Sequence, residues 1–551
     1  MGNPTNILDL PLEILDRILD ELSFKDKLKL AQADQDLQSA FAYHCRNEYK
    51  KISSRTLSLE NWSDFLMVYG PNVDEINVDS LDVQYLKLIE QHCCNLKIIS
   101  GFYLKDHKCT AAKSLISALK SLTSMEITIT NDNTAEVIHI LQEVPNLKIL
   151  SIQFLGETYD ESGVLKQPSS LEKAHIHKLI NLEDLTIRST FGHSAIKIEE
   201  LSSHLKMLRK LNLSGVKFGS APENMELNFP ALEELSISDS HIDVELPYCP
   251  KLCSLRVFNL QYSSSNFFVK WMVNHINTLE SFESDSGVFK KNVLFSIFSS
   301  NSFGEWKFPE IKHLVIRNSK IWFPLPFCPK LISLEFSSTT FFSMNFFFKW
   351  ISKHGTTLQK LSISFELFKE KCRLTKLSKI QSQTWILPAL KDLNITFNTI
   401  SYDLPYCPNL VSLSLEYAKC RSMDYFYKWI LRHSNNLQSL KLREELFEEN
   451  KLLEFLSKCN KIHKLEISDK TISFEFMNSL VNILRENGVT SKNPFEITIS
   501  HNEFLNIQRM LAEIPNSEIC RCVEAYNILE MLEIDVDESF SDVINLTLKW
   551  I

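Results

Sequence analysis

The chain has 551 residues and a formal net charge of −9, and 44% of its residues are hydrophobic. This hydrophobic fraction is typical of a folded globular protein, and the length exceeds one ordinary domain unless the domain is a repeat array. The mild acidity gives no general electrostatic reason to bind nucleic acid or an anionic membrane surface. No apolar run is long enough to cross a bilayer. We therefore expect neither nucleic acid nor a membrane among the partners.

The N-terminal residues and the cysteines indicate an intracellular protein. The opening "MGNPTNILDLPLE" has no basic region followed by a long apolar run, so it is not a secretory signal. The thirteen cysteines are odd in number and scattered, which is typical of reduced thiols. We expect the protein in the cytoplasm, the nucleus or both.

Residues 1–50 predict three short helices. Pro11 suits the first turn of a helix, and apolar residues then recur at helical spacing: Ile14, Leu15, Ile18, Leu19 and Leu22. Ser23 and Asp26 have the spacing of a capping box, which should start a second helix. A third apolar set comprises Leu37, Ala40 and Phe41. So small a piece cannot bury all its apolar surface, so the remaining face must contact the rest of the chain or another protein.

From residue 73 onward one apolar pattern recurs, with starts mostly 20–35 residues apart. Examples are Leu182/Leu185/Ile187, Leu232/Leu235/Ile237 and Leu437/Leu440/Leu442. The end of each unit alternates as a short strand should, and the rest is long enough for a turn and a helix. This pattern resembles the leucine-rich repeat. The resemblance implies an α/β solenoid over residues 51–551, a horseshoe with parallel strands on its concave face.

A longer repeat lies on top of the shorter one. "FPALEELSISDSHIDVELPYCPKL" at 229 returns as "FPEIKHLVIRNSKIWFPLPFCPKL" at 308 and as "LPALKDLNITFNTISYDLPYCPNL" at 387, an offset of 79 residues each time. The segments "FVKWMVNHINTL", "FFKWISKHGTTL" and "FYKWILRHSNNL" obey the same offset. We infer that three leucine-rich units were duplicated as a block over about 229–445. The tail, 532–551, alternates enough to form the last strands, although its acidic part could be a loop.

Several residues with tempting chemistry recur at the 79-residue offset. They are Cys249, Cys328 and Cys407, His275, His354 and His433, and Trp271, Trp350 and Trp429. Neighbouring strands lie about 4.8 Å apart, which puts successive cysteines about 14 Å apart, whereas zinc needs thiolates at about 2.3 Å. We therefore predict buried structural residues and core tryptophans, with no metal and no cofactor.

No catalytic motif stands out. The sequence has no G-x-x-x-x-G-K-[ST], no G-x-G-x-x-G after a strand, no H-E-x-x-H and no G-x-S-x-G. We therefore expect a non-catalytic protein and assign no catalytic residue.

The front piece resembles the F-box. The family opens with Leu-Pro-x-Glu-Ile, matched by residues 10–14, and continues with apolar positions matched by Ile18, Leu19 and Leu22. A following Asp and Leu-x-Leu are matched by Asp26, Leu28 and Leu30. The downstream Val-Cys-x-x-Trp/Phe element is poorly matched, because Ala33, Asp34 and Leu37 occupy it. An F-box at 1–50 followed by repeats is the order found in F-box/leucine-rich-repeat proteins.

This resemblance implies the substrate-recognition subunit of an SCF-type ubiquitin ligase. In the family, the F-box docks on the SKP adaptor, which joins a cullin, while the repeats bind the substrate protein. The residues expected at the adaptor face or in its supporting core are Leu10, Pro11, Ile14, Ile18, Leu22, Leu28 and Leu30. Two alternatives stay open: a plain cap on the open edge of the solenoid, and a scaffold without a ligase.

Substrate-binding candidates lie between the buried apolar positions of the strands, on the open side of the expected sheet. The candidates are Arg256, Phe258, Arg317, Lys360, Lys441 and Arg443. Acidic and polar residues are interspersed with them, so basic side chains are not gathered as a receptor for phosphorylated segments would require. We therefore do not predict phosphate recognition.

Overall fold

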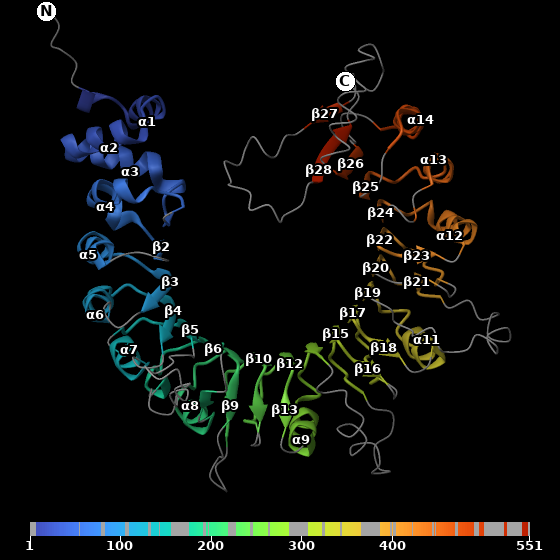
Figure 1. The fold of residues 1–551 in the computed structure, drawn as a ribbon, viewed down its shortest axis with the longest axis horizontal. Helices are drawn as coiled ribbons and strands as arrows, with labels where there is room; N and C mark the ends of the chain where they lie inside the picture. The colour runs from blue at the N-terminus through green and yellow to red at the C-terminus, as the bar shows by residue number, and fades with distance from the viewer. Residues whose placement is uncertain are drawn as a thin grey trace, which may run out of the picture. The chain divides into compact units, whose positions relative to one another are not determined.

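The computed structural model describes residues 7–548 apart from internal gaps, the longest of which are 156–175, 219–226, 286–306, 365–385, 501–522 and 526–542. The chain divides into two compact units, Met1–Thr278 and Leu279–Ile551. Each unit carries a parallel sheet backed by helices, so the predicted α/β solenoid is confirmed (Figure 1). No helix among the described residues is both long and apolar enough to cross a membrane.

The first unit opens with the three helices that the apolar spacing predicted. They are α1 (Leu12–Asp20), α2 (Phe24–Ala33) and α3 (Gln35–His44), flanked by short 3-10 turns at Ile7–Asp9 and Cys45–Asn47. The Ser23 hydroxyl accepts a hydrogen bond from the Asp26 N–H at 3.3 Å and donates one to the Asp26 carboxylate at 2.7 Å. Helix α2 therefore begins where the capping-box spacing placed it.

A parallel sheet follows in the first unit. Its strands are β1 (Lys51–Ile52), β2 (Glu75–Asn77), β3 (Ile98–Leu104), β4 (Ser124–Thr130), β5 (Ile149–Leu155), β6 (Asp184–Ser189), β8 (Lys210–Ser214), β10 (Glu234–Ser238) and β12 (Ser254–Phe258). One register holds from repeat to repeat, because Leu185, Leu211, Leu235 and Leu255 pair in turn. These leucines are buried, while the residues beside them in each strand face the open side of the sheet.

Helices and short outer strands cover the other side of this sheet (Figure 1). The helices are α4 (Trp62–Tyr69), α5 (Val83–His92), α6 (Cys109–Ala118), α7 (Thr134–Leu141), α8 (Ile198–His204) and α9 (Ser265–His275). The outer strands β7 (Ser194–Ile196), β9 (Val216–Phe218), β11 (His241–Ile242) and β13 (Gln261–Tyr262) form a second parallel ladder. Gly215 makes the turn into β9 with φ +68°, and a Cβ there would lie 2.2 Å from the Ser189 carbonyl oxygen.

The second unit repeats the design. Its parallel strands are β14 (Ser281–Ser284), β15 (His313–Arg317), β17 (Ser333–Ser337), β19 (Lys360–Ser364), β20 (Asp392–Thr396), β22 (Ser412–Glu416), β24 (Ser439–Arg443), β25 (Lys464–Ser468) and β26 (Phe495–Ser500). Short outer pairs join β16 (Lys320–Ile321) to β18 (Thr340–Phe341) and β21 (Thr399–Ile400) to β23 (Lys419–Cys420). The helices are α11 (Met344–Ser352), α12 (Met423–Ile430), α13 (Glu449–Ser457) and α14 (Phe474–Glu486).

The parallel order ends at the C-terminus. Strand β28 (Val543–Leu548) pairs antiparallel with β26 and with β27 (Val523–Ala525). The tail therefore contributes a strand, as its alternation predicted, but not a parallel one as the horseshoe prediction implied. An antiparallel partner covers the edge of β26 without needing the helix that a parallel crossover would require.

The recurring tryptophan, histidine and cysteine tie each helix to the preceding turn. In α9 the Trp271 indole N–H donates to the Pro247 carbonyl at 2.6 Å, and the Cys249 backbone N–H donates to His275 Nε2 at 2.9 Å. Because Nε2 accepts, Nδ1 carries the ring proton and donates to the Trp271 carbonyl at 2.7 Å. The imidazole is therefore folded in its neutral form.

The same three hydrogen bonds recur at the 79-residue offset. At α11, the Trp350 indole N–H donates to the Pro326 carbonyl at 2.8 Å. His354, just after the helix, accepts from the Cys328 N–H at 3.1 Å and donates through Nδ1 to the Trp350 carbonyl at 2.9 Å. The matching bonds around α12 join Trp429 to Pro405 and His433 to Cys407, at 2.8 Å and 3.1 Å. The prediction that these cysteines, histidines and tryptophans are buried structural residues is confirmed, since none of the nine is more than 7% exposed.

Candidate functional site

The N-terminal helices leave an apolar surface uncovered. Ile14 is 41% exposed and Leu12 is 38% exposed, although both lie on a helix that buries Leu15 and Leu19 on its other side. The residues expected at the adaptor face differ in burial. Pro11 and Ile14 are exposed, and Leu28 is fully buried. The other four are half-buried: Leu10, Ile18, Leu22 and Leu30. We define the α1 patch as Leu10, Pro11, Leu12, Ile14 and Ile18; Leu28 belongs to the core beneath it.

A polar tie holds α1 in place against the next two helices. His44 Nδ1 lies 2.7 Å from the Asp16 carboxylate, and Lys27 Nζ lies 3.1 Å from His44 Nε2. The ammonium of Lys27 can only donate, so Nε2 accepts and Nδ1–H donates to Asp16. One residue from each of α1, α2 and α3 takes part, so the tie fixes the direction in which α1 presents its patch.

Aromatic packing attaches the helices α2 and α3 to the solenoid. The ring of Phe65 on α4 contacts those of Phe24 and Phe41 at centroid distances of 6.1 and 6.3 Å, and Tyr69 of the same helix contacts Phe41 at 6.2 Å. The Gln38 side-chain amide donates to a carbonyl of α4 at 2.7 Å. The front piece therefore packs against α4, the helix that precedes β2, while the α1 patch remains exposed.

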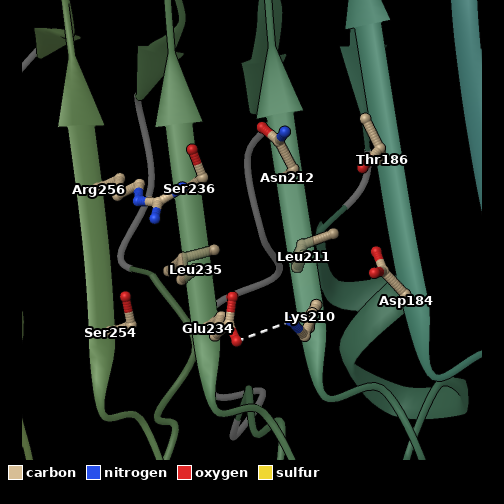
Figure 2. Close-up of a pocket in the computed structure, with 10 residues that line it drawn as sticks. All are labelled: Asp184, Thr186, Lys210, Leu211, Asn212, Glu234, Leu235, Ser236, Ser254 and Arg256. Atoms are coloured by element: carbon tan, nitrogen blue, oxygen red, sulfur yellow. Dashed lines mark ion pairs between the residues drawn. The ribbon is translucent and has the colours of Figure 1, made fainter. Parts of the chain in front are cut away.

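A second surface lies on the open side of the first unit's sheet. A polar cavity of about 160 Å³ spans four strands there (Figure 2). Its side chains come from β6, β8, β10 and β12: Asp184, Thr186, Lys210, Leu211, Asn212, Glu234, Leu235, Ser236, Ser254 and Arg256. Small polar residues in the middle positions of the strands form its floor, with charged residues at its margins.

The charges of this cavity are only partly matched. Lys210 turns towards Glu234 and pairs with it at 2.8 Å (Figure 2). Asp184 lines the cavity on the other side of Lys210 (Figure 2). No residue in the described part of the chain forms an ion pair with it, whereas Glu183 and Glu234 are both paired. Burial raises the pKa of the Asp184 carboxyl; Lys210 opposes this shift and Glu234 adds to it.

In the second unit, the basic residues predicted to bind substrate have acidic neighbours of their own. Lys441 lies between Glu416 and Glu466, at 2.9 Å and 2.5 Å. Arg317 is likewise held between Glu283 of β14 and Glu335 of β17, at 2.9 Å and 3.5 Å. Lys360 pairs with a carboxylate of β20 at 3.6 Å. Their charges are therefore largely balanced within the chain.

Arg443 differs from these lysines and arginines because it stacks on an aromatic ring. Its guanidinium carbon lies 3.5 Å from the ring centroid of Tyr417. Tyr417 is 38% exposed and has a left-handed backbone with φ +52°, a conformation that bulky residues rarely adopt. The remaining two predicted residues, Arg256 and Phe258, lie on β12 in the first unit. The structure thus divides the six predicted residues between two units.

The acidic end of the first unit's cavity is not among the predicted substrate-binding residues. Asp184 and Thr186 alternate with Leu185 and Ile187 in a recognised repeat, so the same rule that selected Arg256 applies to them. Their position in the strand already indicated that both side chains face the open side of the sheet. What it could not reveal is that Asp184, unlike Glu183 beside it, lacks an ion pair among the described residues.

Comparisons with known proteins leave the family of the chain open. No protein-family model matches it, and no curated protein matches it. Among solved structures, a similar chain occurs in "Crystal structure of TLR13-ssRNA13 complex", with 14% identity and a TM-score of 0.36 over 77% of this chain. The match spans 62% of that chain. A similarity at this level identifies neither family nor function, so the fold description rests on the strand pairings.

Proposed function

We propose that the protein is the substrate-recognition subunit of an SCF-type ubiquitin ligase. In this proposal the α1 patch docks on the SKP adaptor, which joins a cullin, and the open side of the sheet binds the substrate protein. The chain does no chemistry itself. It raises the effective concentration of a substrate lysine near the ubiquitin-loaded conjugating enzyme.

The observation that carries the proposal is the exposed apolar surface of α1. Ile14 and Leu12 are the large hydrophobic residues of this helix that stay more than a third exposed, and they fall within the segment that resembles the opening of the F-box. Fully burying such a side chain contributes about 1.5–3 kcal/mol. A patch of this kind is therefore a favourable anchor for a partner's apolar groove.

Calorimetric titration of the full chain with purified SKP adaptor tests the docking step. Ile14→Asp should weaken binding by at least about 30-fold, because it places a charge in an apolar contact worth about 2 kcal/mol. The matched control is Met207→Asp, which alters a 59% exposed methionine in the turn before β8 and should leave the affinity unchanged. Equal affinities for parent and Ile14→Asp would refute docking through the α1 patch, provided that both have the same circular dichroism.

The second candidate is a scaffold whose first helices only cap the solenoid. The packing of Phe24 and Phe41 against Phe65 favours it, because a cap requires this contact whether or not an adaptor binds. The poor match at Ala33 and Asp34 also favours it. This candidate predicts that the parent chain does not bind the adaptor in the same titration.

A further inference from the structure

Asp184 of β6 carries a carboxylate without an ion-pair partner among the described residues. Acidic residues at or just before the start of β6 and β10 have a cation close by: Glu183 with Lys148, Glu233 with Arg209 and Glu234 with Lys210, at 2.7, 2.8 and 2.8 Å. Asp184 is half-buried and forms no ion pair with any residue in the described ranges. This carboxylate is partly desolvated, and the nearby Lys210, whose charge opposes the resulting rise of its pKa, forms its ion pair with Glu234 instead.

The surroundings of Asp184 offer both polar and apolar contacts. Thr186 and Asn212 line the same cavity (Figure 2). The Thr186 hydroxyl can accept a hydrogen bond, and so can the Asn212 side-chain oxygen once the amide turns, because its nitrogen now lies on the Thr186 side (Figure 2). On the other side, Ile149 of β5 pairs in register with Asp184 and is 45% exposed. An anionic site with further acceptors thus adjoins an uncovered aliphatic surface.

We propose that Asp184, Thr186, Asn212 and Ile149 form a subsite for an arginine side chain, carried by an extended segment of the protein that binds the open side of the sheet. The proposal rests on the proposed function, which assigns protein binding to this surface. Beyond protein binding, it specifies that the bound segment carries an arginine.

Arginine fits these residues better than lysine. Its guanidinium has five N–H donors in a planar fork, which can pair with a carboxylate and still reach a hydroxyl and an amide oxygen. Its aliphatic stem would cover Ile149, as long cationic side chains do beside apolar surface. Lys210 does not occupy the site, because its ammonium is turned away towards Glu234 (Figure 2). An incoming guanidinium would also supply the ion pair that this partly desolvated carboxylate does not form with any described residue.

Methyl NMR of the full chain tests this subsite directly. The protein is labelled with ¹³C at the isoleucine δ1 methyl groups and titrated with an acetylated, amidated pentapeptide containing one arginine between glycines and serines. The same peptide with citrulline, which keeps the shape but not the charge, is the matched ligand. The Ile149 methyl signal should shift with the arginine peptide, and the citrulline peptide should bind about fivefold more weakly, the usual effect of losing a part-exposed ion pair.

Two variants complete the test. Asp184→Asn should weaken binding of the arginine peptide by about fivefold, because the ion pair is lost. The thermal midpoint of the protein should not fall, because the amide removes a desolvated charge and keeps the side-chain shape. The control is Asp392→Asn, which changes the residue at the same strand position in β20, where the carboxylate already pairs with Lys360 at 3.6 Å. This control should bind the arginine peptide like the parent.

Equal binding of the arginine and citrulline peptides, or equal binding by parent and Asp184→Asn, would overturn the subsite. The titration contains no adaptor, so its failure leaves adaptor docking untouched. Conversely, a parent chain that binds the arginine peptide but not the adaptor would refute the ligase proposal and retain the subsite. The Asp184→Asn variant should bind the adaptor as tightly as the parent does. Measuring both affinities on this variant therefore distinguishes failure of the subsite from failure of adaptor docking.

Discussion

Acidification should weaken the segment around α12, because His433 is folded in its neutral form. The side chain is 3% exposed, and its Nε2 accepts the backbone N–H of Cys407 at 3.1 Å. Protonation would turn that acceptor into a donor and set a charge inside the core. The pKa of His433 is lowered to about 4, first by burial, with the charge of Arg432 acting in the same direction, against the opposing hydrogen bond to the Trp429 carbonyl.

The sign and size of the effect follow from proton linkage. In the unfolded chain the histidine has its ordinary pKa near 6.5, so between about pH 6.5 and pH 4 the unfolded state binds a proton that the folded state excludes. The stability due to the neutral ring is therefore complete above about pH 7 and declines as the pH falls through this window. At about pH 5 the loss is about 2 kcal/mol from this one residue.

Hydrogen exchange followed by mass spectrometry measures this loss locally. Peptides covering β22 and α12 should lose about 2 kcal/mol of protection between about pH 7.5 and pH 5, after correction for the pH dependence of intrinsic exchange. His433→Gln keeps an acceptor near the position of Nε2 but cannot titrate. The variant should be less stable near neutral pH and should lack this pH dependence.

The control is His463→Gln, because the imidazole of His463 is exposed and its replacement should leave the pH dependence of α12 unchanged. Equal pH dependence of the α12 peptides in the parent and in His433→Gln would refute the reasoning. It would show that the ring is not the group whose protonation the fold opposes.

Three further substitutions test the repeat architecture. Gly215→Ala should cost roughly 3 kcal/mol or more in thermal unfolding, because the new Cβ would meet the Ser189 carbonyl oxygen at 2.2 Å with φ at +68°; an unchanged midpoint would contradict this. Trp350→Phe should cost about 1–2 kcal/mol, because it leaves the Pro326 carbonyl without its indole donor; the urea midpoint reports the loss. Lys441→Met should lower the stability by about 1–2 kcal/mol, because it removes the ammonium that lies between the Glu416 and Glu466 carboxylates; an unchanged urea midpoint would contradict this.

The repeating part of the fold could be predicted because its buried apolar residues recur at regular positions in the sequence. Leucines such as Leu235 and Leu255 recur at a fixed place in each unit, and each is buried at the same point of its strand. The 79-residue offset also identified His275 and its equivalents as structural, and they make matching hydrogen bonds. Local chemistry sufficed at Ser23, whose hydroxyl caps α2 as its spacing to an acidic residue predicted.

The charge balance of the open face could not be predicted from the sequence. Lys441 meets Glu416 and Glu466 from strands that lie 25 residues before and after it in the chain. Such pairing depends on cross-strand register and on the rotamers of long side chains, neither of which the apolar pattern determines. For the same reason the unmatched carboxylate of Asp184 became visible only in the folded structure. The antiparallel pairing of β28 was also missed, because alternation predicts a strand but not its direction.

The most direct test of the ligase proposal is co-purification of the full chain with the SKP adaptor and the cullin together. If the chain is a ligase subunit, the parent and Met207→Asp should retain both proteins, whereas Ile14→Asp should lose both and keep its helix content by circular dichroism. A parent chain that retains neither protein, or retains the adaptor without the cullin, would contradict the assignment to a ligase. Retention of both proteins by Ile14→Asp would contradict docking through the α1 patch.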